Sequence, residues 1–254
     1  MMYIDLNCDM GESFGVYTLG YDEEIMPYVT SINVACGFHA SSPLGMANMV
    51  KLAKKHNLAI GAHPSFPDLL GFGQRNMELS LKEIKADVMY QIGALWAFCQ
   101  AEEVKMQHVK VHGALYDQAA KDIGIAEAIA EAIKAIDPDL YMVCLANSMM
   151  SIGAKHAGIK YVEEAFASRS YNRDNTLVSR AIVGSVIYDA DLVTERVISM
   201  IKNKTVKTID NNHEIKIEAQ TICVNGETRD AVDMIKKIHT SLKAENITLK
   251  SFGS

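Results

Sequence analysis

Short apolar segments alternate along the chain with longer segments of helical periodicity. The short segments are rich in β-branched, aromatic and other apolar residues, as buried parallel strands are. There are seven of them: Tyr3–Cys8, Ser31–Cys36, Ala59–His63, Val109–His112, Leu140–Leu145, Tyr161–Phe166 and Thr221–Val224. The segments between them predict helices over Pro43–His56, Ser80–Glu103, Asp117–Ile136, Ala190–Asn203 and Arg229–Ala244. This alternation predicts right-handed βαβ units and a parallel sheet.

Seven strands in 254 residues favour closure into a distorted β/α barrel, with an open doubly wound sheet as the alternative. No linker, repeat or low-complexity segment interrupts the pattern, so we predict a single domain over residues 1–254. The polar, irregular stretch from Ser168 to Gly184 is long enough to predict a functional loop. The last segment, Ile247–Ser254, is expected either to dock on the domain or to stay loose.

Composition excludes several classes of protein. The net charge is −6, and no run of Lys or Arg is longer than two, which argues against nucleic-acid binding. Five scattered cysteines without a CxxC pair argue against a disulfide framework or a structural zinc site. The longest uncharged apolar stretch, Leu140–Ala154, is too short to span a membrane, and the start of the chain lacks a basic signal-peptide region. We therefore expect a cytoplasmic protein.

Polar side chains stand at the carboxyl ends of the predicted strands. Asp5, Asn7 and Asp9 share one face of the first strand, and Lys110 and His112 share one face of the fourth. The other strand ends contribute His39, His63, Asn147, Glu164 and Asn225 to Glu227. Active sites of β/α folds lie at this end of the strands, so we expect these side chains to form one site. Asp5 fits either that site or a structural hydrogen-bond network inside the barrel.

The eight histidines divide into two groups. His39, His63 and His112 each follow an apolar strand and adjoin a glycine or a tight turn, which favours a functional role. The remaining five are predicted to be structural: His56, His108, His156, His213 and His239. His and Asp can exchange protons near neutral pH, Lys can stabilise an oxyanion, and three His with Asp can hold a divalent metal. Hydrolysis of an amide or similar carbonyl fits all three.

Nucleotide and serine-hydrolase motifs are missing from the sequence. No GxSxG, GxGxxG or GxxxxGK[ST] pattern occurs, and Gly153–Gly158 lacks the Lys-Ser/Thr that completes a phosphate-binding loop. A standard ATP-binding loop is therefore not expected in this chain.

Five long motifs resemble the LamB/YcsF family, which forms the A component of prokaryotic 5-oxoprolinase. They cover nearly the whole chain in the family's order: Asp5–Gly15, Asn33–Ala40, Gly61–Asp68 with Gly71–Arg75, Lys110–Tyr116, and Glu164–Tyr171 with Leu177–Arg180. The resemblance implies a seven-stranded, distorted, TIM-like barrel of the glycoside hydrolase/deacetylase type. It also implies ATP-dependent opening of the 5-oxoproline lactam to L-glutamate, together with B and C subunits.

On this resemblance we assign the candidate site. The catalytic candidates are Asp9, His39, His63 and His112, with Asp9 and His112 as the acid/base pair and a divalent metal as an open question. Lys110 and Arg75 are expected to hold the substrate carboxylate or a phosphate, since arginine gives bidentate contacts to anions. The other predicted substrate-binding residues are Asn7, Glu12, Tyr116, Glu164 and Arg169.

The sequence departs from the family pattern at three polar positions. Ser168 stands where an acid is expected, Asn225 where a histidine is expected, and Gln74 where a second arginine is expected. Two other hypotheses stay open. The Asp and His content also permits a metal-dependent deacetylase that acts on sugar amides without ATP. Ser168 and Asn225 keep open a non-catalytic subunit that binds a small acid.

Overall fold

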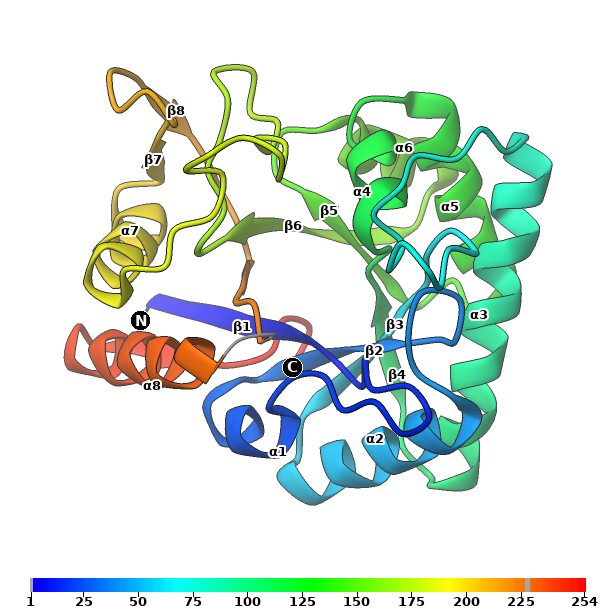
Figure 1. Ribbon diagram of the computed structural model, residues 1–254. Helices are drawn as coiled ribbons and strands as arrows, with labels where there is room; N and C mark the ends of the chain where they lie inside the picture. Colours follow the sequence, from blue (N-terminus) through cyan, green and yellow to red (C-terminus); the bar gives the residue numbers. More distant parts are fainter. Residues whose placement is uncertain (1, 227–228) are drawn as a thin grey trace.

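Seven parallel strands close into a barrel in the computed structural model, which describes residues 2–226 and 229–254 (Figure 1). In barrel order they are β1 (Met2–Met10), β2 (Ser31–Ala35), β3 (Ala59–His63), β4 (Met106–Val109), β5 (Tyr141–Leu145), β6 (Lys160–Phe166) and β9 (Thr221–Cys223). The ring closes because β9 pairs with both β6 and β1. The predicted β/α barrel is confirmed, and the open-sheet alternative is wrong.

The barrel is distorted at three places. β4 and β5 are paired only at His108↔Tyr141 and Val109↔Met142, and β9 contributes three residues. The register between β3 and β4 also shifts at Gly61, where a Cβ atom would lie 2.1 Å from the His108 ring. Glycine at position 61 therefore lets that ring occupy the space beside β3.

The fourth strand begins and ends earlier than the sequence predicted. It covers Met106–Val109 instead of Val109–His112. Lys110 and His112 still follow β3, because their backbone N–H groups donate to the carbonyls of Ala62 and Pro64. Both side chains consequently stand where the strand opens into the loop.

The end of the chain docks on the barrel. Its strand β10 (Ile247–Leu249) pairs in parallel with Met2–Ile4 of β1, beside the seven-stranded ring. Of the two expectations for the C-terminal segment, docking on the domain is confirmed.

Helices surround the barrel (Figure 1). They are α1 (Asp22–Ile25), the short 3-10 helix η1 (Met26–Tyr28), α2 (Pro43–His56), α3 (Leu81–Ala101), α4 (Gly113–Ala119), α5 (Ile123–Ile136), α6 (Met149–Ala157), α7 (Ala190–Lys202) and α8 (Arg229–Ala244). A hairpin of β7 (Thr205–Lys207) and β8 (Glu214–Lys216) lies outside the barrel. The sequence did not predict α1, α6 or this hairpin.

Side-chain caps set several helix starts. Ser80 forms the predicted capping box with Glu83, and Ser42 accepts from Gly45 N at the start of α2. The single helix predicted over Asp117–Ile136 is wrong, because the segment forms α4 and α5. The first ends at Ala119, and Asp122 caps the second by accepting from Gly124 N and Ile125 N.

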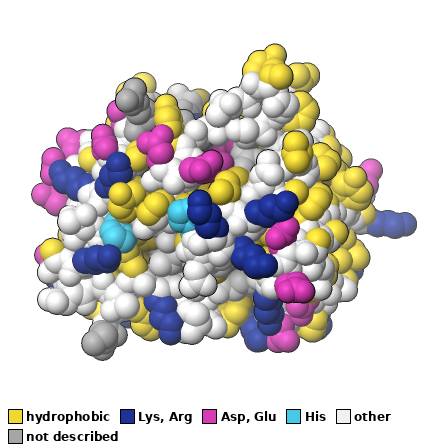
Figure 2. Space-filling model, turned by 90° about the horizontal axis from the view of Figure 1, so that it is seen from below, with side chains coloured by type: hydrophobic (Ala, Val, Ile, Leu, Met, Phe, Trp, Pro, Cys, Tyr) yellow, Lys and Arg dark blue, Asp and Glu magenta, His cyan; other side chains and the backbone are white. Residues whose placement is uncertain are grey.

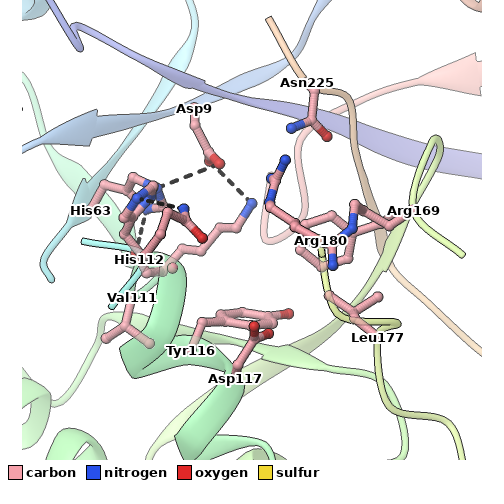
Figure 3. A pocket seen from close by; sticks show the side chains of 14 residues that line it. Asp9, His63, Val111, His112, Tyr116, Asp117, Arg169, Leu177, Arg180 and Asn225 are labelled. Atoms are coloured by element: carbon pink, nitrogen blue, oxygen red, sulfur yellow. Dashed lines mark hydrogen bonds and ion pairs between the residues drawn. The ribbon is translucent and has the colours of Figure 1, made fainter. Parts of the chain in front are cut away.

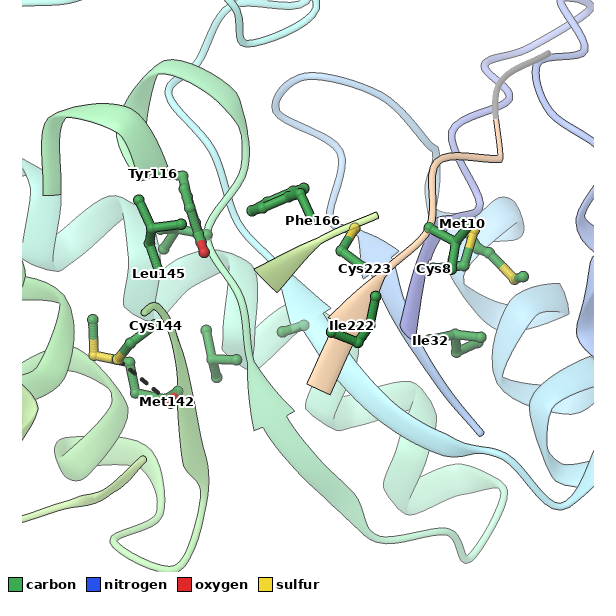
Figure 4. Packing of buried hydrophobic residues seen from close by; sticks show 14 of the residues in the cluster. Cys8, Met10, Ile32, Tyr116, Met142, Cys144, Leu145, Phe166, Ile222 and Cys223 are labelled. Atoms are coloured by element: carbon green, nitrogen blue, oxygen red, sulfur yellow. Dashed lines mark hydrogen bonds between the residues drawn. The ribbon is translucent and has the colours of Figure 1, made fainter. Parts of the chain in front are cut away.

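The two faces of β1 differ in character. Ile4, Leu6, Cys8 and Met10 are buried among apolar residues, whereas the alternate residues Asp5, Asn7 and Asp9 make polar contacts inside the barrel. Figure 4 shows this packing: Cys8, Met10 and Ile32 lie on one side of the view, and Met142, Cys144 and Leu145 lie on the other. All five cysteines are buried and free.

The outer surface mixes charges. On the face seen from below, where α1 and α2 lie in Figure 1, acidic, basic and hydrophobic side chains are interspersed (Figure 2). Within the described ranges, no helix is both long and apolar enough to cross a membrane.

Candidate functional site

A cleft opens at the carboxyl ends of the strands. The space that protein atoms leave in it, including open solvent at its mouth, is about 430 Å³. Strand ends and following loops supply its lining: Asp9, His63, Gln74, Lys110, Val111, His112, Gly113, Tyr116, Asp117, Phe166, Arg169, Leu177, Arg180 and Asn225 (Figure 3). The predicted convergence of strand-end residues is present.

Asp9 is the acidic centre of this cleft. Its Oδ1 lies 3.1 Å from Lys110 Nζ, and its Oδ2 lies 3.4 Å from His63 Nε2. Burial alone would raise the pKa of Asp9, but the charges of His63 and Lys110 hold it well below the ordinary value. The side chain keeps 20% of its surface exposed, so an ionised carboxylate faces the cleft.

Lys110 is almost fully buried below the cleft. Its Nζ lies 2.9 Å from Glu164 Oε1 and within hydrogen-bond distance of Asn7 Oδ1, at 3.2 Å. Burial opposes its charge, but Asp9 and other neighbouring acidic groups hold the pKa of Lys110 well above the ordinary value. It is a fixed cation between two carboxylates.

The three predicted functional histidines are each anchored through one ring nitrogen. His39 Nδ1 lies 2.9 Å from Ser65 Oγ, His63 Nδ1 lies 2.6 Å from the carbonyl of Lys110, and His112 Nε2 lies 2.9 Å from the carbonyl of Phe72. Such partners fix the orientation of a ring and direct its second nitrogen. We call Asp9, His39, His63, Lys110 and His112 the mouth cluster.

Hydrogen bonding orients the rings of His63 and His112 toward each other. Carbonyl oxygens only accept, so His63 Nδ1 and His112 Nε2 donate to them. The remaining nitrogens, His63 Nε2 and His112 Nδ1, are 2.9 Å apart. Burial and the neighbouring His63 lower the pKa of His112 to about 3, which leaves His112 neutral.

Four residues of the site could hold a metal ion. Glu12, His39, His63 and His112 each offer a ligand atom, and these atoms lie within 4.8 Å of one another. One carboxylate with histidines suits zinc and other first-row divalent metals. His39 and His112, however, are stacked with ring centroids 3.8 Å apart and an interplanar angle of 6°. Ring lone pairs lie in the ring plane, so this stacking favours a set of Glu12, His63 and one of the two stacked rings.

A second polar layer lies deeper in the barrel, and we call it the floor network: Asp5, Asn7, Asn33, His108, Glu164 and Thr221. Asp5 accepts hydrogen bonds from Thr30, Ser31 and Thr221. Asn7 Nδ2 donates to Glu164 Oε1 at 2.9 Å and to Thr221 Oγ1 at 2.7 Å. Asp5 therefore belongs to a structural network, the second of the two roles considered for it.

The predicted substrate-binding residues occupy four kinds of position. Lys110, Tyr116 and Arg169 line the cleft, while Asn7 and Glu164 lie beneath it. Glu12 is buried beside His39, with 3.7 Å between its Oε1 and His39 Nε2. Arg75 does not line the cleft; its side chain is 65% exposed and pairs with Asp68.

Sequence reasoning missed Asp117 and Arg180 as residues of the cleft wall. Asp117 falls within a predicted helix, where a carboxylate gives no signal of function. Arg180 lies within the polar segment from Ser168 to Gly184 that the sequence predicts to be a functional loop, and that loop was the available signal. The five histidines predicted to be structural do not line the cleft.

The departures Ser168 and Asn225 are neighbours in space. Ser168 Oγ lies 3.4 Å from Asn225 Oδ1. A neutral hydrogen-bonding pair thus stands where the family resemblance leads us to expect an acid and an imidazole. Gln74, the third departure, places its Nε2 3.2 Å from His112 Nε2.

Comparison with known proteins gives consistent matches over the full chain. The profile of the LamB/YcsF family matches residues 4–254. The A component of 5-oxoprolinase from Alkaliphilus metalliredigens is 51% identical over 254 residues, covering 100% of this chain and 99% of that protein. The protein of the same name from Clostridium beijerinckii is 51% identical over 249 residues, covering 98% and 97%. The crystal structure of a lactam utilization protein from Thermus thermophilus has a TM-score of 0.93 and 43% identity, covering 99% of this chain and 100% of that one.

Proposed function

Because the chain belongs to the LamB/YcsF family, we propose that it is the A component of an ATP-dependent 5-oxoprolinase, which opens the lactam of 5-oxo-L-proline to L-glutamate. Full-length similarity to relatives that carry the name of this component supports the proposal. The observation that carries it is the mouth cluster: an ionised carboxylate, a buried cation and three histidines at one cleft.

The chemistry requires one activation and two waters. Transfer of a phosphoryl group to the amide oxygen of the lactam makes its carbon electrophilic. Water then adds to that carbon, and the ring C–N bond breaks as the nitrogen gains a proton. The product is an acyl phosphate, which a second water hydrolyses to glutamate and phosphate.

Residues of the mouth cluster match these steps. Asp9 faces the cleft and takes the proton of the attacking water. The His63–His112 pair gives a proton to the departing nitrogen. Lys110 stabilises negative charge on the oxygen atoms bonded to the reacting carbon, since it is a cation held in a buried position.

Partners complete the proposal. The relatives are named as one lettered component of 5-oxoprolinase, which points to an assembly, and we propose B and C subunits as its other members. The sequence has no standard ATP-binding loop, so we assign nucleotide binding to the assembled complex. Cytoplasmic localisation follows from this role.

Glutamate release from 5-oxoproline tests the proposal. The purified chain is mixed with the presumed B and C subunits and ATP, and wild type is compared with His112→Ala. His156→Ala is the control, because His156 is an exposed partner of Glu127. Normal turnover by His112→Ala would refute the assignment of the site. Binding of 5-oxoproline without turnover in any mixture would favour a non-catalytic binding protein.

A second candidate function rests on the cluster of Glu12, His39, His63 and His112. If it holds a divalent metal, the metal would supply Lewis-acid activation of water, and the chain would hydrolyse a sugar amide without ATP. Metal content of wild type and His39→Ala, measured by elemental analysis, separates the candidates. A stoichiometric ion that His39→Ala loses supports this function. A metal-free protein that still turns over 5-oxoproline counts against it.

A further inference from the structure

Two arginines line the wall of the cleft opposite the histidines. His63 and His112 lie on one side of Figure 3, and Arg169 and Arg180 lie on the other. Both arginines come from the segment after β6, which returns across the mouth of the barrel. Arg180 reaches toward Asn225 and Asp9 in this view.

Arg169 is positioned for a ligand that the protein itself does not supply. Its side chain is buried, with 5% of the residue exposed, and Nη2 donates to the carbonyl of Val178 at 2.7 Å. Its Nε is buried and makes no hydrogen bond to any described residue. A buried guanidinium with an unused N–H is costly unless an acceptor fills the site.

Charge differs between the two halves of the cleft. On the inner half, Lys110 stands between the carboxylates of Asp9 and Glu164. On the outer half, Asp117 is the acidic residue lining the cleft beside Arg169 and Arg180. The charges of both arginines oppose the rise that burial causes in the pKa of Asp117. The outer half has one more cation than anions, so it suits a monoanion.

We propose that Arg169 and Arg180 form an anion subsite that holds the carboxylate of the lactam acid and selects acids over neutral lactams. This deepens the proposed function and rests on it. The subsite replaces Arg75 in the role of carboxylate partner, since Arg75 pairs with Asp68 outside the cleft. With the carboxylate at the arginines, the ring carbonyl is directed to the inner half of the cleft, at Asp9 and Lys110.

Paired substrates test the subsite. 5-Oxoproline and its uncharged carboxamide share the lactam ring and differ in the carboxylate. KM and kcat are measured for both, in the complex with B and C subunits, for wild type, Arg180→Ala and Arg180→Lys. Arg173→Ala is the matched control, because Arg173 is an exposed arginine of the same segment that pairs with Asp210 at 2.8 Å.

Loss of the charge-assisted contact should raise KM for 5-oxoproline about 30-fold in Arg180→Ala. KM for the carboxamide should change less than about 3-fold, and Arg180→Lys should restore part of the selectivity. An equal loss on both substrates would overturn the proposal, and it would instead fit contact with a phosphoryl group. An unchanged ratio of the two KM values would overturn it as well.

Failure of the proposed function has a different signature. In that case wild-type complex releases no glutamate, and calorimetric binding to the isolated chain becomes the readout. If wild type binds 5-oxoproline more tightly than the carboxamide and Arg180→Ala abolishes this preference, the subsite is still supported. Absence of that preference in wild type would refute it.

Discussion

The mouth cluster and the floor network both contain aspartate and histidine, and they differ in how their hydrogen bonds are satisfied. Asp5, in the floor network, has three hydroxyl donors, and Asn33 Nδ2 donates to both Asn7 Oδ1 and Asp9 Oδ1. In the mouth cluster, His39 Nε2 has no hydrogen-bond partner among the described residues, and two histidine rings face each other.

Two histidines four residues apart show the contrast. His108 Nε2 lies 2.8 Å from Asn33 Oδ1, and its Nδ1 lies 3.1 Å from Gln107 Oε1, so both nitrogens face amide groups of the protein. His112 faces another titratable ring at the edge of the cleft. A satisfied polar layer specifies one packing of a barrel interior, whereas incompletely satisfied groups are available to a substrate.

Substituting these two histidines gives the largest expected difference. His112→Ala should lower kcat for 5-oxoproline about 1,000-fold, as loss of acid–base catalysis does, with little change in unfolding free energy. His108→Ala should instead cost about 2–3 kcal/mol of stability, because it leaves buried Asn33 unsatisfied. Activity and urea unfolding are measured on both variants. If His112→Ala and His108→Ala lower the free energy of unfolding equally, the mouth cluster and the floor network do not differ in their contribution to stability.

The pH dependence of stability probes Asp5. Burial raises the pKa of Asp5 to about 6 in spite of its hydrogen bonds. Its folded-state pKa lies above its unfolded value, so Asp5 contributes fully to the free energy of unfolding below about pH 4, and this contribution is lost as the pH rises through about 6. The lost contribution is about 3 kcal/mol, at 1.36 kcal/mol for each pKa unit.

Urea unfolding of wild type and Asp5→Asn at about pH 4.5 and about pH 7.5 checks this prediction. The substitution should remove the loss at the higher pH. Asp139→Asn is the control, because pairing with Lys160 lowers the pKa of Asp139 and gives the opposite sign. If the free energy of unfolding falls by the same amount between the two pH values in wild type and in Asp5→Asn, the prediction is contradicted.

Thr221→Val tests hydrogen bonding within the floor network. The hydroxyl donates to Asp5 and accepts from Asn7, so valine removes two buried hydrogen bonds. We expect a loss of about 2 kcal/mol in unfolding free energy, with kcat nearly unchanged. Thr240→Val, on the surface of α8, should change stability by less than about 0.5 kcal/mol. If Thr221→Val leaves the free energy of unfolding unchanged, the hydrogen bonds of Thr221 do not stabilise the floor network.

Arg75→Ala is expected to have the smallest effect. The side chain of Arg75 is 65% exposed and pairs with Asp68, and neither residue lines the cleft. KM for 5-oxoproline should change less than about 2-fold, in contrast to Arg180→Ala. A large increase in KM would restore Arg75 as the carboxylate partner.

The sequence by itself determined the barrel and most of the mouth cluster. Strand-length apolar segments and capped helices are local signals, and parallel strands necessarily bring their carboxyl ends together. Asp9, His63 and His112 could therefore be assigned to one site without coordinates. The alternation of Asp5, Asn7 and Asp9 also follows from the two-residue period of a strand.

Tertiary structure decided which charged groups meet. Nothing in the sequence distinguishes Arg75 from Arg180. In the folded chain, Arg75 pairs with Asp68, whereas Arg180, in the segment after β6, lines the cleft. Ser168 and Asn225 became a pair only because β9 closes the barrel between β6 and β1. Contacts between residues far apart in sequence depend on the closed fold, and no local pattern encodes them.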